Sequence, residues 1–349
     1  MPSLAYPMHC HLLVPGLFFP FQPGEENPLA RTSSSALCTL LARGRQERGL
    51  ARGMEEWLCR AFGVEKQMDW PVASLALLAD GGPRGNGNWL RADPVHLSLQ
   101  RDRLILADSD SFSLSGPEAR TLADTLNHHF SAEGLEFLPL HPLRWYLRLQ
   151  TVSDMQTVPL PEARGRDVRT MLPRGKDALR WSGILTEIQM LFHDHPVNEA
   201  REARGELPIN SVWLWGGGRL PERLGRPFDK VWADDPLALG LASAAGSIRA
   251  TLPPSAEDWL AAASAGSHLV VLDSLRPAAQ RGDVSAWNEG VKSLEARWFG
   301  PLKRAVQAGK LAVTLHIPAA TGSLSVTASR TDLWKIWRRP RPLAGHFQP

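Results

Sequence analysis

The sequence predicts a layered α/β fold that carries an inserted α+β subdomain. Strand and helix patterns alternate near both ends of the 349-residue chain, whereas its middle contains pairs of neighbouring strands. A polar stretch at 151–176, rich in Arg and Pro, has no clear period and predicts a long connection. We therefore expect residues 1–80 and 210–349 to form a core sheet with helices on both faces, and residues 81–209 to form the subdomain.

The first 80 residues predict a strand, a helix and a second strand. A short apolar run at 11–14 is followed by leucines at helical spacing within 35–43. Residues 72–79 form a continuous apolar run of strand length, so we expect a buried strand there. The apolar stretch 12–21 lacks the basic segment and cleavage site of a signal peptide, which favours a buried strand and its turn.

The middle of the chain predicts a hairpin, a capped helix and a second strand pair. Apolar residues alternate over 95–99 and continue at 104–106, which is typical of a hairpin. Ser115 and Glu118 have the spacing of a capping box at the start of a helix that Gly134 ends. The other elements expected here are strands at 135–140 and 144–149 and a helix at 181–192.

The last third predicts a second alternation of strands and helices. A strand at 211–215 precedes a glycine loop at 216–218. One apolar stripe over 285–308 predicts a helix with a kink, because Gly290 and Pro301 interrupt it. The remaining predicted elements are a helix at 235–250, a helix capped by Ser255 and Asp258, a strand at 268–272, and a hairpin of 311–317 with 324–328.

Charge and cysteine content exclude several classes of protein. The formal net charge is +3 and both signs are mixed along the chain, so no general nucleic-acid or membrane binder is predicted. The three cysteines have no C-x-x-C spacing, which argues against a disulfide framework and a structural zinc and favours a reducing cytoplasm. No apolar stretch approaches the roughly 20 residues of a membrane span. Basic residues gather only near the C-terminus, where Lys335, Arg338, Arg339 and Arg341 surround Trp334 and Trp337.

The segment 193–219 contains the candidate ligand-binding residues. His193 and His195 are not expected to chelate a metal, because helical residues two apart diverge and Pro196 favours an extended His195. Asn198 and Arg201 share one face of a helical turn, where Arg201 either grips a phosphate or carboxylate or forms an internal ion pair. The glycine loop offers backbone amides to an anion but lacks the P-loop and dinucleotide motifs. The predicted anion-binding set is Asn198, Arg201, Asn210, Gly216, Gly218 and Arg219.

Residues 195–218 resemble a segment of archaeal-type, cofactor-independent phosphoglycerate mutases that reads H-P-V-N-x-x-R, a Gly, then P-x-N-x-x-W-L-W-G-x-G. Those enzymes are metal-dependent members of the alkaline-phosphatase superfamily and use a covalent serine intermediate, so the resemblance implies an alkaline-phosphatase-like core sheet. The whole chain is similar to a bacterial group labelled RpfE-type regulatory proteins. That similarity is carried by residues 89–97, 108–112, 144–147 and the W-R-R-P-R-P tail.

The catalytic residues of the mutases do not carry over. Pro15 stands where a metal-binding Asp is expected, and Thr39 where another carboxylate is expected. The segment 69–75 has no serine at the nucleophilic position. Only Asp273 and His316 resemble family ligands, and two isolated candidates cannot form a two-metal clamp.

Three functional hypotheses follow. The first is a regulatory or ligand-binding protein, without metal or cofactor, that has lost phosphoryl transfer and binds an anionic small molecule or a protein partner. The second is an active metal-dependent mutase or phosphohydrolase. The third uses the basic tail to bind an acidic partner or nucleic acid. The second hypothesis draws its metal ligands from Asp80, Asp93, His96, Asp108, Asp110, Asp273 and His316.

Overall fold

The computed structural model describes residues 8–20, 35–85, 87–107 and 111–346, which form two compact units. The described residues up to Gly63 and from Leu224 onward make unit 1, and Val64–Arg223 make unit 2. This division differs from the expected boundaries at 80/81 and 209/210. The reason is that residues 72–79 and 211–218 pack and pair with the strands of unit 2.

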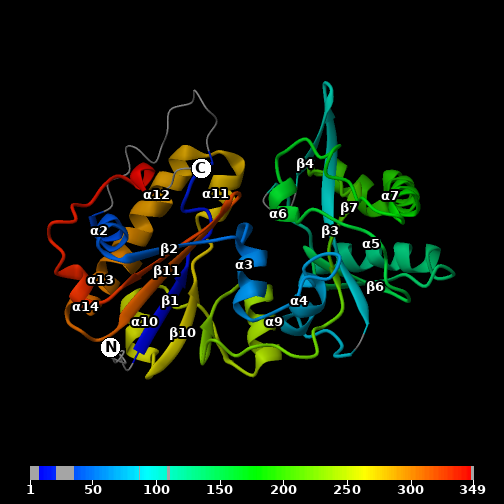
Figure 1. The fold of residues 1–349 in the computed structure, drawn as a ribbon. Helices are drawn as coiled ribbons and strands as arrows, with labels where there is room; N and C mark the ends of the chain where they lie inside the picture. Colours follow the sequence, from blue (N-terminus) through cyan, green and yellow to red (C-terminus); the bar gives the residue numbers. More distant parts are fainter. Residues whose placement is uncertain (1–7, 21–34, 86, 108–110, 347–349) are drawn as a thin grey trace. The chain divides into compact units, whose positions relative to one another are not determined.

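Unit 1 is built on a seven-stranded sheet in the order β2-β12-β11-β1-β10-β8-β9. The strands from β11 to β9 pair in parallel, so their carboxyl ends share one edge of the sheet, whereas β12 pairs antiparallel with both β11 and β2 (Figure 1). The strands are β1 (Met8–Leu13), β2 (Arg45–Gly49), β8 (Lys230–Trp232), β9 (Ile248–Ala250), β10 (Gly266–Val271), β11 (Ala312–Ala319) and β12 (Gly322–Ala328).

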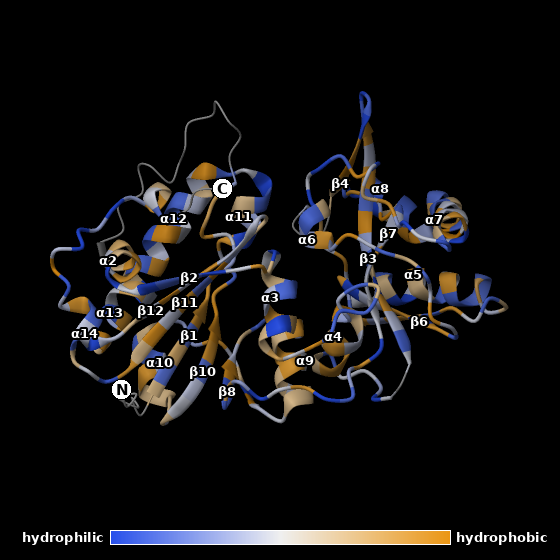
Figure 2. Ribbon diagram, in the orientation of Figure 1, coloured by the Kyte–Doolittle hydropathy of each residue, from blue (hydrophilic) through white to orange (hydrophobic). Residues whose placement is uncertain are grey.

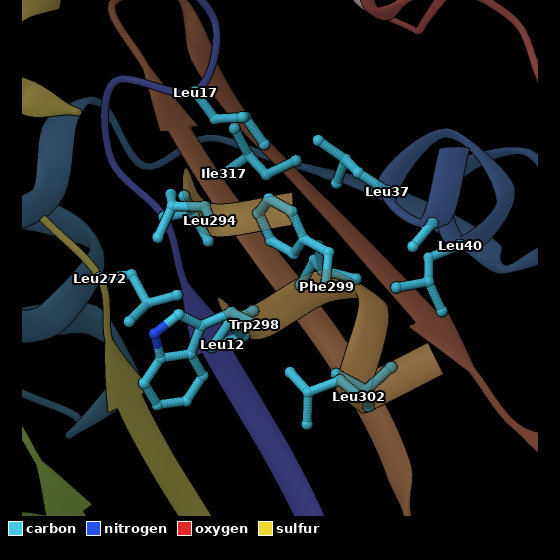
Figure 3. Packing of buried hydrophobic residues seen from close by; sticks show 14 of the residues in the cluster. Leu12, Leu17, Leu37, Leu40, Leu272, Leu294, Trp298, Phe299, Leu302 and Ile317 are labelled. Atoms are coloured by element: carbon cyan, nitrogen blue, oxygen red, sulfur yellow. The ribbon is translucent and has the colours of Figure 1, made fainter. Parts of the chain in front are cut away.

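Helices cover both faces of this sheet. Cys10 and Leu12 of β1 point to a core formed with α2 (Ser35–Arg43), α10 (Ala256–Ala262) and α12 (Val284–Leu294). Figure 3 shows Leu12, Leu272 and Ile317 beside Leu37, Leu294 and Leu302 in this core. The opposite face meets α3 (Gly53–Ala61), which also contacts α9 (Pro236–Ala245). The other helical segments of unit 1 are α11 (Arg276–Arg281), a π-helical turn (Glu295–Phe299), α13 (Gly300–Gln307), α14 (Arg330–Leu333) and a 3₁₀ turn (Leu343–Gly345).

Unit 2 contains a five-stranded antiparallel sheet in which β3 pairs with β4, β6 and β7. Side chains of β3 alternate between faces. Leu90 and Ala92 join the core under α5 and α7, and Trp89 packs with α4 on the other side. The elements are α4 (Val72–Ala79), β3 (Asn88–Gln100), β4 (Arg103–Ala107), α5 (Gly116–His129), β5 (Glu136–His141), β6 (Arg144–Leu149), α6 (Leu160–Ala163), α7 (Ala178–His193), α8 (Pro196–Ala203) and β7 (Ser211–Gly218).

The mixed α/β class, the sheet flanked by helices and most elements agree with the prediction. The predicted strand at 72–79 is wrong, because this segment is helix α4. Six of its eight residues are buried, and it is hydrophobic along its length (Figure 2), so it has no polar face that would reveal helical periodicity.

Other segments are also compared with the prediction. The predicted glycine loop 216–218 belongs to β7, and the predicted helix 235–250 ends at Ala245, where Gly246 adopts a left-handed conformation before β9. Strand β2 was not predicted, because all five of its residues are exposed and no apolar alternation marks it. The predicted kink within 285–308 takes the form of a π-helical turn between α12 and α13. No helix in the described residues has both the length and the hydropathy to cross a bilayer.

Candidate functional site

Acidic side chains collect where the parallel strands of unit 1 end. Asp235 follows β8, Asp273 follows β10, and Glu55 lies in the first turn of α3. We call Glu55, Asp235 and Asp273 the carboxylate cluster. Asp235 also begins α9, because its Oδ1 accepts a hydrogen bond of 2.9 Å from the Ala238 amide. The carboxyl edge of a parallel sheet is where ligand sites of such folds form.

The charges of the carboxylate cluster interact with one another. Burial raises the pKa of Asp235 to about 6, the Ala238 amide opposes this rise, and the negative charges of Asp273 and Glu55 reinforce it. Burial raises the pKa of Asp273 as well, against the pull of Arg276. The cluster therefore needs a nearby positive charge to stay ionised at neutral pH.

Arg276 supplies that positive charge. Its guanidinium donates a hydrogen bond to Glu55, and a second nitrogen lies 3.5 Å from the sulfur of Met54. Burial opposes the charge of Arg276, but Glu55, Asp235 and Asp273 outweigh burial and raise its pKa. Arg276 is thus the cation that interacts with all three carboxylates of the cluster.

The turn after β1 holds the backbone of Arg276 in place. Gly16 has a φ of +78°, and a Cβ there would come within 2.9 Å of the Arg276 Cα atom. The Trp287 indole donates a hydrogen bond of 2.8 Å to the Gly16 carbonyl, which fixes this turn against α12. Close backbone contact therefore orders the residue that neutralises the cluster.

The cluster does not fit a two-metal centre. A guanidinium has only donors and no lone pair for a metal, and its positive charge repels a metal ion. In the part of the chain that the structure describes, no three His, Cys, Asp or Glu side chains converge as a metal site. Pro15 follows β1 at the same sheet edge and offers no ligand atom.

His316 joins a different group, on the sheet face that meets α3. Its Nε2 lies 3.1 Å from Nδ1 of His11, and its Nδ1 lies 2.9 Å from the Ser325 hydroxyl. His9 stacks on His11 with ring centroids 4.1 Å apart, and Trp57 covers His316 at 4.5 Å. We call His9, His11 and His316 the histidine stack.

The lowered pKa values of the histidine stack favour neutral imidazoles. Burial, together with the charges of His9 and His316, lowers the pKa of His11 to about 3. Burial likewise lowers the pKa of His316 to about 3. Sequence reasoning missed His9 and His11, although alternate residues of a strand share one face and this spacing was the available signal.

Three other predicted metal ligands, Asp80, Asp93 and His96, belong to unit 2 and are bound to protein groups. Asp80 accepts hydrogen bonds from Arg144 at 2.8 and 2.9 Å and from the Tyr146 hydroxyl at 2.7 Å. Asp93 pairs with Arg91 at 2.7 Å. The Trp215 indole also donates to Asp93 at 2.8 Å. His96 donates from Nδ1 to the Pro208 carbonyl at 2.8 Å. Asp108 and Asp110 lie outside the described residues.

Asn198 and Asn210 brace the backbone of unit 2. The amide of Asn198 donates to the carbonyls of Phe192 and Ile209 at 2.7 Å, and its oxygen accepts from Ile209 N–H at 2.8 Å. Asn210 accepts from Leu97 N–H at 2.7 Å and donates to the Leu97 carbonyl at 2.8 Å. An anion would have to replace these bonds to reach either amide.

Arg201 is fully buried and faces internal partners. Its Nε donates to the Leu207 carbonyl at 2.9 Å, and Nη1 lies 3.2 Å from Glu206 and 3.6 Å from Glu118. The geometry matches the internal ion pair, the second of the two roles that the sequence left open.

Three glycines, 216–218, end β7, and we call this part of β7 the glycine strand. It lies against α4. Gly216 has a φ of +65°, its amide donates to Thr157 at 3.2 Å, and a Cβ there would approach Val72 Cβ to 2.9 Å. A Cβ at Gly218 would come within 2.7 Å of Pro71. Arg219 is exposed, and its Nε donates to the Asn88 oxygen at 2.7 Å.

The two histidines before this segment lie in different helices. His193 ends α7 with an exposed side chain. His195 begins α8, where its Nδ1 accepts from Val197 N–H at 3.2 Å and its Nε2 lies 3.0 Å from Thr125. His195 therefore caps the start of a helix.

Comparisons with known proteins show which proteins the chain is similar to. No family model matches it. A 2,3-bisphosphoglycerate-independent phosphoglycerate mutase from Methanosarcina mazei is 30% identical over 120 residues, 34% of this chain and 30% of the relative. A probable enzyme of the same name from Geobacter sulfurreducens is 27% identical over 212 residues, 57% of this chain and 52% of the relative. The chain thus spans about a third and about half of these relatives.

Solved structures show the fold. The PH0037 protein from Pyrococcus horikoshii superposes with a TM-score of 0.57 at 11% identity, covering 92% of this chain and 87% of that one. A cofactor-independent phosphoglycerate mutase from Thermoplasma acidophilum aligns with a TM-score of 0.45 at 16% identity, covering 92% of this chain and 89% of that one. The predicted similarity to cofactor-independent phosphoglycerate mutases is therefore confirmed, and the mixed α/β fold is shared with a solved structure.

Proposed function

We propose that this chain is a regulatory or ligand-binding protein on a mutase-like fold, of the RpfE-type that its sequence resembles, and that it does not catalyse metal-dependent phosphoryl transfer. The observation that carries the proposal is Arg276, whose guanidinium bonds to Glu55 and places a positive charge beside Asp235 and Asp273. The proposal needs no resident metal and no cofactor.

The physical argument concerns where positive charge is needed. Phosphoryl transfer requires cations aimed at the charge that develops on the phosphoryl oxygens. The positive charge at this sheet edge instead points at Glu55, Asp235 and Asp273. A fixed guanidinium among the carboxylates also repels a divalent cation that would otherwise use them as ligands.

The alternative is an active mutase or phosphohydrolase. In that case Arg276 must leave the carboxylate cluster so that Asp273 and its neighbours become free to bind metal. The ligands available to this alternative are limited, since Asp80, Asp93 and His96 already bind protein groups in unit 2.

Metal analysis and activity assays test the two readings together. The purified full chain is incubated with Mn²⁺, Zn²⁺ or Mg²⁺ and desalted, and its metal content is measured by mass spectrometry. Interconversion of 3- and 2-phosphoglycerate and hydrolysis of p-nitrophenyl phosphate are assayed in parallel, with the Methanosarcina mazei enzyme as positive control. We expect substoichiometric metal and no turnover above background. About two bound metal equivalents with turnover of either substrate would establish the alternative.

The ligand class that we propose for unit 2 is an anionic small molecule. Support comes from Arg219, the exposed cation of the predicted set, beside the backbone of the glycine strand. Asn198, Arg201 and Asn210 bind protein groups near the start of β7, whereas Arg219 follows the end of that strand, so these three residues do not share its site. Thermal-shift measurements with phosphoglycerates and nucleotides test the ligand class, because a ligand that prefers the folded state raises the apparent Tm.

A further inference from the structure

The last described stretch of the chain exposes large apolar side chains in a row. After α14, Trp334, Ile336 and Trp337 have exposed fractions of 71%, 72% and 74%. Figure 1 shows this segment in red along the outer side of α2. Single exposed apolar residues are common, but a group of them beside charged residues is typical of an interaction surface.

A basic hollow lies next to Trp337. Its volume is about 470 Å³, and it opens between the tail and the end of α2 within unit 1. We call it the tail pocket. The residues that line it are Ala42, Gln46, Trp337, Arg338, Arg339, Arg341, Gly345 and His346.

We call the described residues after α14, 334–346, the tail, and specific contacts hold it beside α2 and β2. Arg43 Nη1 donates to the Leu333 carbonyl at 2.6 Å, and Arg338 Nη1 donates to the Gly44 carbonyl at 3.5 Å. The side chain of Gln46 lies 3.3 Å from Nδ1 of His346. The tail pocket is therefore bounded by the folded part of unit 1 as well as by the tail.

The tail pocket carries positive charge without an internal counter-charge. The neighbouring acids are already paired, Asp332 with Lys335 at 2.6 Å and Glu47 with Arg45 at 3.3 Å. In the described ranges no carboxylate pairs with Arg339 or Arg341. Both guanidinium groups are exposed, and they can bind a carboxylate from outside through two parallel hydrogen bonds.

We propose that the tail pocket binds an acidic segment of a partner protein, with apolar side chains of that segment packed on Trp334, Ile336 and Trp337. Ile336 favours a peptide over nucleic acid, since an aliphatic side chain offers no stacking surface for a base. Strand β2 also favours a peptide as the partner. It is the outer strand of the sheet, its five residues are exposed, and Gln46 belongs both to β2 and to the pocket.

An outer strand adds main-chain hydrogen bonds to an extended peptide, and the exposed Arg48 on β2 suits an acidic one. Nucleic acid, by contrast, is usually bound by a broad basic face, and the formal charge of this chain is only +3. No member of the carboxylate cluster takes part, so this proposal is independent of whether the sheet edge is catalytic.

Binding of labelled probes to the full chain tests the proposal. The probes are a fluorescein-labelled peptide of Glu, Asp and Leu, a peptide in which Lys replaces the acids, and a single-stranded oligonucleotide of similar length. Fluorescence anisotropy is recorded at about 50 mM and about 300 mM salt, because screening weakens charge pairs. We expect the acidic peptide to bind most tightly and to lose affinity as salt rises.

Two variants separate the charged and apolar contributions. Replacing Arg339 and Arg341 together by Glu weakens acidic-peptide binding at least about tenfold at low salt and flattens the salt dependence. Trp337→Ala weakens binding several-fold and leaves the salt dependence unchanged. The matched control replaces the exposed Arg103 and Arg120 of unit 2 by Glu, which changes the net charge equally and leaves binding within about twofold.

Three outcomes overturn the proposal. One is no detectable binding of the acidic peptide by a folded chain. Another is tighter binding of the oligonucleotide that is lost on replacing Arg339 and Arg341, which makes the surface a nucleic-acid site. The third is equal weakening by the unit 2 control variant, which reduces the effect to net charge.

Discussion

Arg276 lies in the first turn of α11, and its single positive charge interacts with three carboxylates. Removing Arg276 would leave the carboxylates of the cluster without their cation. Loss of one partner of a buried ion pair destabilises a protein more than replacement of the whole pair by apolar residues. The residue therefore connects local electrostatics with the stability of unit 1.

Arg276→Met should destabilise unit 1 by about 3 kcal/mol at pH 8, in the range reported for breaking a buried ion pair. Without the guanidinium, the pKa values of Asp235 and Asp273, which burial already raises, rise further in the folded state. Stability is then retained at low pH and lost as the pH rises through those folded pKa values. The loss relative to wild type should be smaller at pH 5 than at pH 8, as measured by urea unfolding.

Arg304→Met is the matched control for this experiment. Arg304 pairs with Glu257 at 3.0 Å, but both side chains are about two-thirds exposed. An exposed pair contributes at most about 1 kcal/mol, with little dependence on pH in this range. A pH-independent loss in Arg276→Met would show that the guanidinium acts by packing alone.

Among the elements, α4 and β7 of unit 2 depend on glycine for their close approach. Gly216→Ala combines a φ of +65° with a Cβ that would sit 2.9 Å from Val72 Cβ. We expect a loss of about 2–3 kcal/mol in the free energy of unfolding, from left-handed strain and overpacking together. Urea unfolding measures this loss.

Gly183→Ala, on the exposed side of α7 with no heavy atom within 4 Å of its added Cβ, provides the opposite control. Alanine is the better helix former by up to about 1 kcal/mol, so this variant should be neutral or more stable. If both glycine variants retain wild-type stability, the contact between α4 and β7 does not require Gly216.

The elements α5, α4 and β2 show how much of the fold could be predicted from the sequence. The capping box of Ser115 and Glu118 is local chemistry, and the structure contains both of its hydrogen bonds. The apolar run of α4 and the exposed residues of β2 carry no periodic signal, so only tertiary packing decides their conformation. Arg276 escaped prediction for a similar reason, because Glu55 and Asp235 are brought to it by the fold rather than by sequence spacing.

At the level of the whole molecule, each unit has its own core. The chain leaves unit 1 at Gly63 and returns to it at Leu224, and the buried clusters of the two units share no residue. Separate cores allow each unit to unfold with its own stability, so a single global ΔG is not assured. Measurements on this chain therefore need a probe that is assigned to one unit.

The histidine stack makes the stability of unit 1 dependent on pH. The pKa values of His11 and His316 are lowered to about 3 by burial, whereas an unfolded histidine titrates near 6.5. The unfolded chain therefore binds more protons, and stability is lost as the pH falls below about 6.5. Each such histidine contributes up to about 1.4 kcal/mol per pH unit over the interval between the two values.

His11→Gln should reduce the slope of stability against pH between about pH 6 and 4.5 by roughly one histidine's share. Urea unfolding followed by hydrogen exchange of peptides covering β1 and β11 reads unit 1 alone. His193→Gln changes an exposed histidine of unit 2 and should leave that slope unchanged. An unaltered slope in His11→Gln would mean that the stack accepts protons in the folded state, because neutral buried imidazoles require the unfolded chain to be the better proton acceptor.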